Sequence, residues 1–581
     1  MNNFFVTGSK DGFRIKLWRG ERMCLLGFNV EQPEDDFVGF AVEYQEPGSN
    51  EWLKLNNRLN FSYSASTNGY RNYPATEAPL QMFRWIHFPW NPQPGMYTYK
   101  ITKMHMPQDN KLEKGLSITE SLSLDPVTYP NFLDIGFTRN FASSQAFNDF
   151  LFRNHIPANQ EIIPDDADKG FDFAAKKKAL EPTGIYQWMG FEGGEMIFNF
   201  LKEAVNDTSI EIDAMMYDFN LPDILELLKS LGGRLRAVID DSETVDKNGK
   251  KSGHKLPGSC ESKAAKQLRS TAGQGNIIRG HFKSLQHNKV FIAKRNGVPF
   301  KVLTGSTNFS YRGIYIQANN VLGFSNEEIA RLYEKMFEEA FNDMDNFSKN
   351  SLAAKWYAVT PDNFPAVHFC FSPHKSSDLS LNPLGGAIDQ ADSSVLYAVA
   401  FLSLIKSGAV REALDRLIKK PLFSYGISDK RGKLELKKPD GSMGIVDFEY
   451  LSKNAPEPFK SEWSAGKGIN IHHKFVVTDF NLPTAKVFTG SSNLAPSGEK
   501  ENGDNLIMIE DQRIAAVYAI EALRIFDHLH FRTKMKAADK NAPKELVLQK
   551  PIAISHMEKP WFNEYYVANS QRERDRKIFS S

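Results

Sequence analysis

The alternation of hydrophobic and polar positions divides the chain into two parts. Up to about residue 125, short aromatic and β-branched runs predict strands at 37–44, 83–88 and 96–101, separated by clusters of turn-forming residues. Several short strands between such turns are typical of two packed sheets. We therefore expect an all-β sandwich, immunoglobulin-like or fibronectin-like, over residues 1–125.

After about residue 130, the pattern changes to strands that alternate with amphipathic helices. Residues 210–216 and 235–239 have the pattern of buried strands on either side of a helix at 222–231, which predicts a βαβ unit. The same order returns later in the chain, with a strand within 395–404, a helix at 410–418 and a strand at 475–478. The second part is therefore expected to be an α/β body.

Composition and charge exclude several classes of protein. A chain of 581 residues with 41% hydrophobic residues is too long for one core and too apolar for global disorder. Its 71 Lys and Arg against 70 Asp and Glu leave a net charge of +1, so any attraction to a polyanion must be local. The three cysteines, Cys24, Cys260 and Cys370, lie far apart and predict neither a disulfide scaffold nor a thiolate zinc site.

The apolar stretches predict no membrane segment. The first residues lack the basic region and apolar run of a secretory signal, because Lys10, Asp11 and Arg14 interrupt the pattern. The longest apolar stretch, around 395–405, is about half of what a bilayer span requires. We expect a cytoplasmic protein.

An internal repeat carries the candidate chemistry. The segment from His287 through Gly305-Ser306-Thr307-Asn308 matches the segment from His472 through Gly490-Ser491-Ser492-Asn493. Each matching residue in the second copy lies 185 positions after its counterpart. A lone H-x-K is usually a surface or core feature and G-S-x-N usually a turn, but identity and interval repeated together favour catalysis.

Two copies of this set suit a displacement at phosphorus. One histidine can attack the phosphorus while the other protonates the leaving oxygen. Lysine, asparagine and serine side chains can donate to the oxygens on which charge builds up, so no metal and no cofactor is needed. The predicted catalytic residues are His287, His472, Lys289, Lys474, Asn308 and Asn493, with Ser306 and Ser491 added for phosphate binding.

Other histidines lack a repeated partner. His473 aligns with Asn288 in the first copy, so we expect its side chain to point to the opposite face of a strand. His254 and His281 have no counterpart, and His528 with His530 is expected to be structural.

With these motifs the sequence resembles the phospholipase D superfamily, whose signature H-x-K-x(4)-D followed by G-S-x-N occurs twice per active site. The second copy matches fully, with Asp479 as the motif aspartate and Asp504 as the downstream acid, which the resemblance adds to the predicted catalytic residues. The first copy has Lys294 and Asn319 at these two positions. The resemblance implies a pseudo-two-fold α-β-α sandwich of two repeats. The predicted domains are the β-sandwich at 1–125, the repeats at 126–365 and 366–545, and a C-terminal extension at 546–581.

The departures in the first copy suggest different roles for the two histidines. In the superfamily the motif aspartate is mainly structural, so Lys294 is expected to cost little and to reach solvent, and Asp479 and Asn319 are assigned supporting roles. If the downstream residue of one half supports the histidine of the other, Asp504 orients His287 as the nucleophile that forms a phosphohistidine. His472, left without a carboxylate, is then the general acid/base.

The resemblance indicates the reaction better than the substrate. A basic segment at 247–283 slightly favours nucleic acid, and thus a nuclease, although Asp240, Asp241 and Glu243 dilute the charge and a solvated insertion explains it equally well. A second insertion at 429–467 is Lys-rich but mixed in sign, and basic character alone does not exclude an anionic phospholipid. The alternative is a phospholipase D or transphosphatidylase acting on phospholipids. A second alternative, a catalytically impaired binding protein, is disfavoured because both His–Lys–Asn sets are retained. One monomer suffices for a complete site, and a homodimer is compatible with it.

Overall fold

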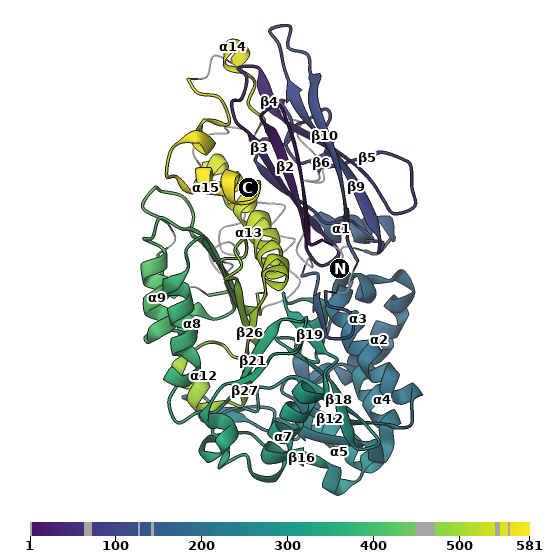
Figure 1. Cartoon of the computed structure of the whole chain (residues 1–581). Coiled ribbons are helices and arrows are strands. Elements are labelled where there is room, and N and C mark those ends of the chain that lie inside the picture. Colours follow the sequence, from purple (N-terminus) through teal and green to yellow (C-terminus); the bar gives the residue numbers. More distant parts are fainter. Residues whose placement is uncertain are drawn as a thin grey trace.

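The computed structural model describes most of the chain (Figure 1). The described residues are 3–62, 72–125, 128–140, 145–157, 159–430, 432–435, 437–447, 471–540, 547–555 and 558–581. Most of the mixed insertion predicted at 429–467 and the side chains of His528 and His530 lie outside this description. Within it, no helix has the length and apolar character that crossing a bilayer requires.

The described residues of the N-terminal part form two four-stranded antiparallel sheets, in addition to a short two-stranded sheet of β6 (Asn56–Asn57) and β7 (Tyr73–Pro74). One has the order β1 (Phe5–Lys10), β2 (Phe13–Arg19), β3 (Cys24–Val30) and β8 (Arg84–His87), and the other has the order β10 (Glu113–Ser123), β9 (Met96–His105), β4 (Phe37–Gln45) and β5 (Leu53–Lys54). Phe28 on the first sheet packs on Phe40 of the second, with ring centroids 4.6 Å apart. The strands predicted within residues 1–125 are confirmed, and the immunoglobulin-like or fibronectin-like identity remains a prediction.

The first half of the α/β body has a seven-stranded mixed sheet. Its order is β11 (Leu133–Phe137), β19 (Asn320–Phe324), β18 (Val298–Gly305), β17 (Val290–Arg295), β12 (Ile210–Met216), β13 (Leu235–Ile239) and β16 (Ile277–Arg279). Helix α4 (Pro222–Leu231) joins the parallel strands β12 and β13, as the hydrophobic pattern predicts.

The second half has an eight-stranded sheet that repeats this order. It runs β20 (Tyr357–Val359), β21 (Ala366–Ser372), β27 (Asp504–Glu510), β26 (Lys486–Gly490), β25 (Lys474–Thr478), β22 (Ser394–Val399), β23 (Phe423–Ser428) and β24 (Ile445–Asp447). The strands that carry the repeated motifs, β17 and β25, therefore occupy matching central positions. The apolar run at 395–404 is a strand only as far as Val399 and then turns into a short 3-10 helix, η8 (Leu402–Leu404).

Two long helices join the halves. Tyr333 of α7 (Glu327–Asp343) lies edge-on to Phe369 of the second sheet, with centroids 5.6 Å apart. Tyr518 of α13 (Gln512–Lys540) lies edge-on to Phe137 of the first sheet at 5.4 Å. Each helix thus packs on the sheet of the other half, so the two halves share one hydrophobic core.

The C-terminal segment returns to the N-terminal β module (Figure 1). Trp561 packs on Phe37 and Phe83, each at 5.5 Å between ring centroids, so it contributes to the core of the β sandwich. Arg84 of β8 donates to Asp575 of α15 (Gln571–Ile578) at 2.6 Å. The domain boundaries remain predictions. The described residues after 546 pack against the N-terminal β module.

Candidate active site

Each repeated histidine lies in a short segment that pairs with a segment of the other half. Gln286, just before His287, forms a parallel bridge with Gly503, just before Asp504. The main-chain N–H of His287 donates to the carbonyl of Gly503 at 2.9 Å. The counterparts of these two residues, His472 and Ala318, make the same contact. The N–H of His472 donates to the carbonyl of Ala318 at 3.0 Å. Each histidine therefore lies beside the downstream residue of the opposite half.

His287 is held by a carboxylate. Its Nδ1–H donates to Oδ1 of Asp504 at 2.7 Å, and the same oxygen accepts from the Ser491 hydroxyl at 2.7 Å. Burial lowers the pKa of His287 to about 4 even though Asp504 opposes the shift, and the charge on Lys289 lowers it further. The imidazole is therefore neutral near pH 7, with the lone pair of Nε2 free to attack.

His472 is held by an amide instead. Its Nδ1 lies 2.9 Å from Oδ1 of Asn319 and 3.2 Å from the carbonyl of Ser306. The Asn319 amide nitrogen donates to the Gly313 carbonyl, so its oxygen faces the histidine. Both neighbours accept, which places the proton of His472 on Nδ1. Burial, with the charges of Lys474 and Lys289, lowers the pKa of His472 well below its usual value.

The two lysines occupy equivalent positions beside the histidines. Nζ of Lys474 donates to the carbonyl of His472 at 2.8 Å, and Nζ of Lys289 donates in the same way to the carbonyl of His287. Burial lowers the pKa of Lys289 to about 7, and burial with the charge of Lys289 lowers the pKa of Lys474 well below its usual value. Two buried ammonium groups close to each other form a place where an anion would be stabilised.

The asparagines and serines of the motifs divide into two groups. Oδ1 of Asn308 and Oδ1 of Asn493 are buried without a hydrogen-bond partner among the described residues. The serines instead donate to the groups that accept from the histidines. Ser306 donates to Oδ1 of Asn319 at 2.8 Å, and Ser491 donates to Oδ1 of Asp504. Thus each of these asparagines has an unused acceptor oxygen, and Nδ2 of Asn308 lies 3.5 Å from Oδ2 of Asp218. Both serine hydroxyls donate to the groups that orient the histidines.

Comparison with known proteins agrees with the motifs. Residues 200–341 match the family model described as "Cardiolipin synthase, PLD-like domain". The chain contains a phospholipase D-like domain. The match includes the first copy of the repeat, with His287, Lys289 and Asn308, so the departures at Lys294 and Asn319 leave the family pattern recognisable.

Solved structures similar to this chain include three of distant sequence. Phosphatidylserine synthase of Haemophilus influenzae Rd KW20 is 13% identical, with 57% of this chain and 84% of that chain covered and a TM-score of 0.39. For Nuc, a phospholipase D family member from Salmonella typhimurium, the values are 21%, 25%, 86% and 0.18. For yeast tyrosyl-DNA phosphodiesterase they are 10%, 54%, 87% and 0.29. No curated protein matches the sequence.

The two residues at the motif-aspartate position have different partners. Oδ1 of Asp479 accepts from the main-chain N–H of Ser393 at 2.7 Å and fixes the start of β22. Lys294 is buried, with Nζ 2.9 Å from Oδ2 of Asp213 on the neighbouring strand β12. The expectation that Lys294 reaches solvent is wrong, because the buried carboxylate of Asp213 compensates the buried ammonium group.

His473 lies on the opposite face, as its lack of a counterpart predicts. Its Nε2 is 3.1 Å from Oε1 of Glu521, and both side chains are buried. Asn288, at the matching position, instead accepts from Nδ2 of Asn505 at 3.1 Å. The counterpart of Asn505, Asn320, donates to Thr489 at 2.6 Å. The layer beneath the centre therefore differs between the halves.

Two aspartates that the repeat did not reveal position the histidine segments. Oδ1 of Asp240, directly after β13, accepts from the N–H of Gln286 at 2.7 Å. Oδ1 of Asp429, directly after β23, accepts from the N–H of Ile471 at 3.3 Å. Asp429 lies 189 positions after Asp240 rather than 185, so a search at one fixed interval misses the pair. The available signal is an aspartate at the end of each apolar strand.

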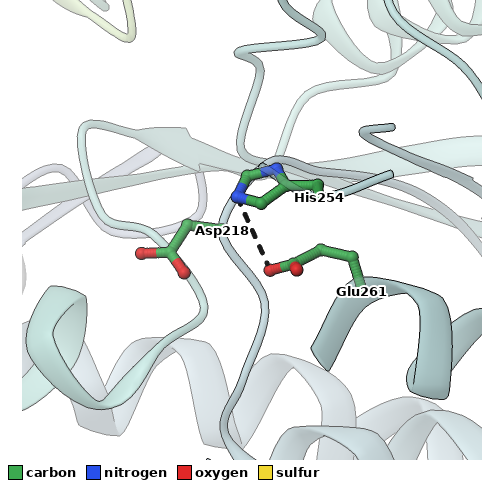
Figure 2. Close-up of side chains that lie close together, drawn as sticks. All are labelled: Asp218, His254 and Glu261. Carbon is green, nitrogen blue, oxygen red and sulfur yellow. Dashed lines mark ion pairs between the residues drawn. The ribbon is translucent and has the colours of Figure 1, made fainter. Parts of the chain in front are cut away.

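Aromatic side chains stand beside the two histidines and differ between the halves. The Tyr217 ring lies 4.8 Å from that of His287, and Nζ of Lys289 lies 4.9 Å from the Tyr217 ring centroid. Phe401 stands edge-on to His472 at 6.5 Å. Tyr217 also contacts the ring of His254 at 4.8 Å, and His254 with Asp218 and Glu261 is a group of potential metal ligands (Figure 2).

Proposed function

We propose that the protein is a phosphodiesterase whose chemistry needs no metal, with His287 as nucleophile and His472 as general acid/base. The observation that carries this assignment is the unequal support of the two histidines, Asp504 at one and Asn319 at the other. A carboxylate stabilises the cationic imidazole that forms when a histidine attacks phosphorus. An amide gives no such charge compensation and suits a group that must release its proton.

In the first step, Nε2 of His287 forms a bond to phosphorus and the bond to the leaving oxygen breaks. The leaving oxygen keeps the electron pair and takes a proton from Nε2 of His472. The charge of the bound phosphodiester raises the low pKa of His472, so the anion itself promotes protonation of its acid. The product of this step is a phosphohistidine, held as a cation by Asp504.

In the second step, a water molecule attacks phosphorus and the P–N bond breaks. Nε2 of His287 recovers its electron pair, and Nε2 of His472 takes a proton from the water. An alcohol in place of water would give transfer instead of hydrolysis. Through both steps the ammonium groups of Lys289 and Lys474 and the amides of Asn308 and Asn493 stabilise the non-bridging oxygens. A pseudo-two-fold axis between the halves would relate these donors.

Nucleic acid is the substrate class that we propose first. The hairpin of β14 (Glu243–Val245) and β15 (Lys251–Gly253) leads directly to His254 beside the centre. Lys251 pairs with Glu243 at 3.0 Å, and Lys247 and Lys250 are exposed. Such lysines can attract a phosphate backbone. Other basic residues of this segment contribute less, since Arg279 donates to main-chain carbonyls and Lys283 pairs with Glu501 at 2.9 Å.

A phospholipid is the second candidate, favoured by the opposite rim. Phe401 beside His472 is followed by η8, whose Leu404 is 47% exposed. An apolar side chain at this place would suit an acyl chain better than a nucleotide. The two rims thus favour different substrates, and only a direct comparison of substrates distinguishes them.

The test incubates the full chain in EDTA with single-stranded DNA, duplex DNA, RNA and phosphatidylcholine vesicles. We expect cleavage of a nucleic acid by the wild type and none by His287→Ala, with His281→Ala as a histidine control outside the repeat. Cleavage of vesicles alone would make the phospholipid the substrate. Loss of wild-type activity in EDTA would contradict the metal-independent chemistry, and no cleavage of any substrate would favour a binding protein.

A further inference from the structure

We propose that Asp218, His254 and Glu261 bind a divalent transition-metal ion beside the active site, a function beyond the proposed phosphodiester chemistry. One potential ligand atom from each of the three lies within 4.8 Å of the others. Asp218 follows β12, His254 follows β15, and Glu261 lies in the first turn of α5 (Cys260–Ala272). Figure 2 shows these three side chains close together, with His254 facing Glu261.

His254 is oriented as a metal-binding histidine is. Its Nδ1 lies 2.8 Å from Oδ2 of Asp240, which is fully buried, and its Nε2 lies 3.8 Å from Oε1 of Glu261. A carboxylate on one ring nitrogen fixes the ring and leaves the other nitrogen directed at the ion, the usual outer arrangement of metal-bound histidines. Asp240 is not one of the three potential ligands, so this contact is independent of the cluster.

The donor set indicates the kind of ion. One imidazole nitrogen and two carboxylates suit Zn²⁺ or Mn²⁺ and leave open positions for water. The neighbouring thiol of Cys260 contacts the carbonyl of Ala167 at 3.3 Å, so the set contains no sulfur. The His254 side chain is 19% exposed and Asp218 is half-buried, which gives an ion access from solvent.

The charge of the cluster also favours a cation. Three carboxylates, those of Asp218, Asp240 and Glu261, converge on one imidazole. They accept from neutral donors as well, among them the Ser310 hydroxyl on Asp218 and the main-chain N–H of Phe219 on Glu261. Because buried carboxylates need compensation, a dication between them would be stabilised.

The cluster is coupled to the catalytic centre by two direct contacts. Asp240 holds His254 with one carboxylate oxygen and the N–H of Gln286, next to His287, with the other. The Tyr217 ring lies between the rings of His254 and His287, 4.8 Å from each. A bound ion would therefore lie next to the segment that carries His287 without contacting the reacting phosphorus, and activity in EDTA remains the separate test of the proposed function.

The experiment measures metal binding by the full chain, freed of metal with EDTA and transferred to chelator-free buffer. Titration with ZnCl₂ in a calorimeter should give one Zn²⁺ per chain. His254→Ala and Glu261→Gln should each weaken this binding by about 10- to 100-fold. Glu261→Gln keeps an oxygen for the Phe219 N–H, so it separates loss of the ligand from loss of the fold, and circular dichroism checks that each variant is folded.

Two controls show where the ion binds. His281→Ala removes a histidine of the same half that is also paired with an aspartate, Asp241 at 2.6 Å, and should bind Zn²⁺ like the wild type. A His287→Asn, His472→Asn double variant should also retain binding. Absence of a stoichiometric site in the wild type, binding that survives His254→Ala, or binding lost in the double variant would each overturn the proposal.

Discussion

The two halves of the α/β body have the same strand order but differ in the group that accepts a hydrogen bond from the histidine. His287 donates to a carboxylate oxygen of Asp504, whereas His472 donates to an amide oxygen of Asn319. The two acceptors therefore differ in charge. Both imidazoles are buried, and in each the pKa is lowered chiefly by burial. Burial thus favours the neutral form of both imidazoles, and in the proposed mechanism the carboxylate at Nδ1 of His287 is the group that stabilises positive charge during the covalent step.

The largest expected effect on kcat comes from replacing the two histidines themselves. His287→Ala should lower kcat on the order of 10⁴-fold and abolish the covalent adduct. His472→Ala should lower kcat by about 10²- to 10⁴-fold, because the leaving oxygen loses its proton donor, and should still form adduct with a substrate whose leaving group needs no proton. Acid quenching followed by mass spectrometry locates the adduct, and finding it on His472 would reverse the two roles.

The next effect comes from making the two acceptors alike. Asp504→Asn should lower kcat by roughly 10²- to 10⁴-fold, since the cationic imidazole of His287 loses its carboxylate. Asn319→Asp in the same assay serves as the matched change in the other half. It should raise the pKa of His472 and move the pH dependence of kcat rather than abolish activity. Equal losses in both variants would show that the carboxylate has no special partner.

A smaller effect is expected from the protonation state of Lys289. The pKa of Lys289 is lowered to about 7 by burial, so its charged form is lost as the pH rises through 7. Accordingly kcat/KM should fall above pH 7, whereas on the acid side His287 stays neutral down to about pH 4. Lys289→Gln should cost about 10²- to 10³-fold in kcat and flatten the alkaline fall. An unchanged fall in this variant would assign it to another group.

The smallest expected effect concerns the rims of the centre. Lys250→Ala on the exposed β14–β15 hairpin should weaken the binding of a nucleic acid modestly and make it less sensitive to salt. Leu404→Ser on the opposite rim should leave that binding unchanged and reduce only activity toward vesicles. Filter binding at two salt concentrations measures the first and vesicle turnover the second, and the opposite pattern would exchange the roles of the rims.

The residues of the candidate centre could be picked out from the sequence because the chain between histidine and asparagine has the same length in both copies. That constant interval made His287, Lys289 and Asn308 recognisable beside their counterparts, and extended to Asn319 and Asp504. The strands β12 and β13 and the helix between them also followed directly from hydrophobic periodicity.

Other features could not be read from the sequence because they depend on contacts between distant segments. Asp240 and Asp429 escape a fixed-interval search, since the connections between them and the histidine segments differ in length. The burial of Lys294 depends on Asp213, which reaches it only across paired strands. Trp561 joins a core built around Phe37, and an aromatic residue in an irregular segment has no periodic signal that points to such a partner.

The crossed pairing of the histidine segments has a genetic consequence. Because the N–H of His287 is held by Gly503 and that of His472 by Ala318, neither half encodes a working centre by itself. A substitution of Asp504 in the second half alters the hydrogen bond of His287 in the first half. A substitution of Asn319 in the first half alters that of His472 in the second half. Two fragments divided between the halves would each be inert, and activity would return only when both are produced together and reassemble.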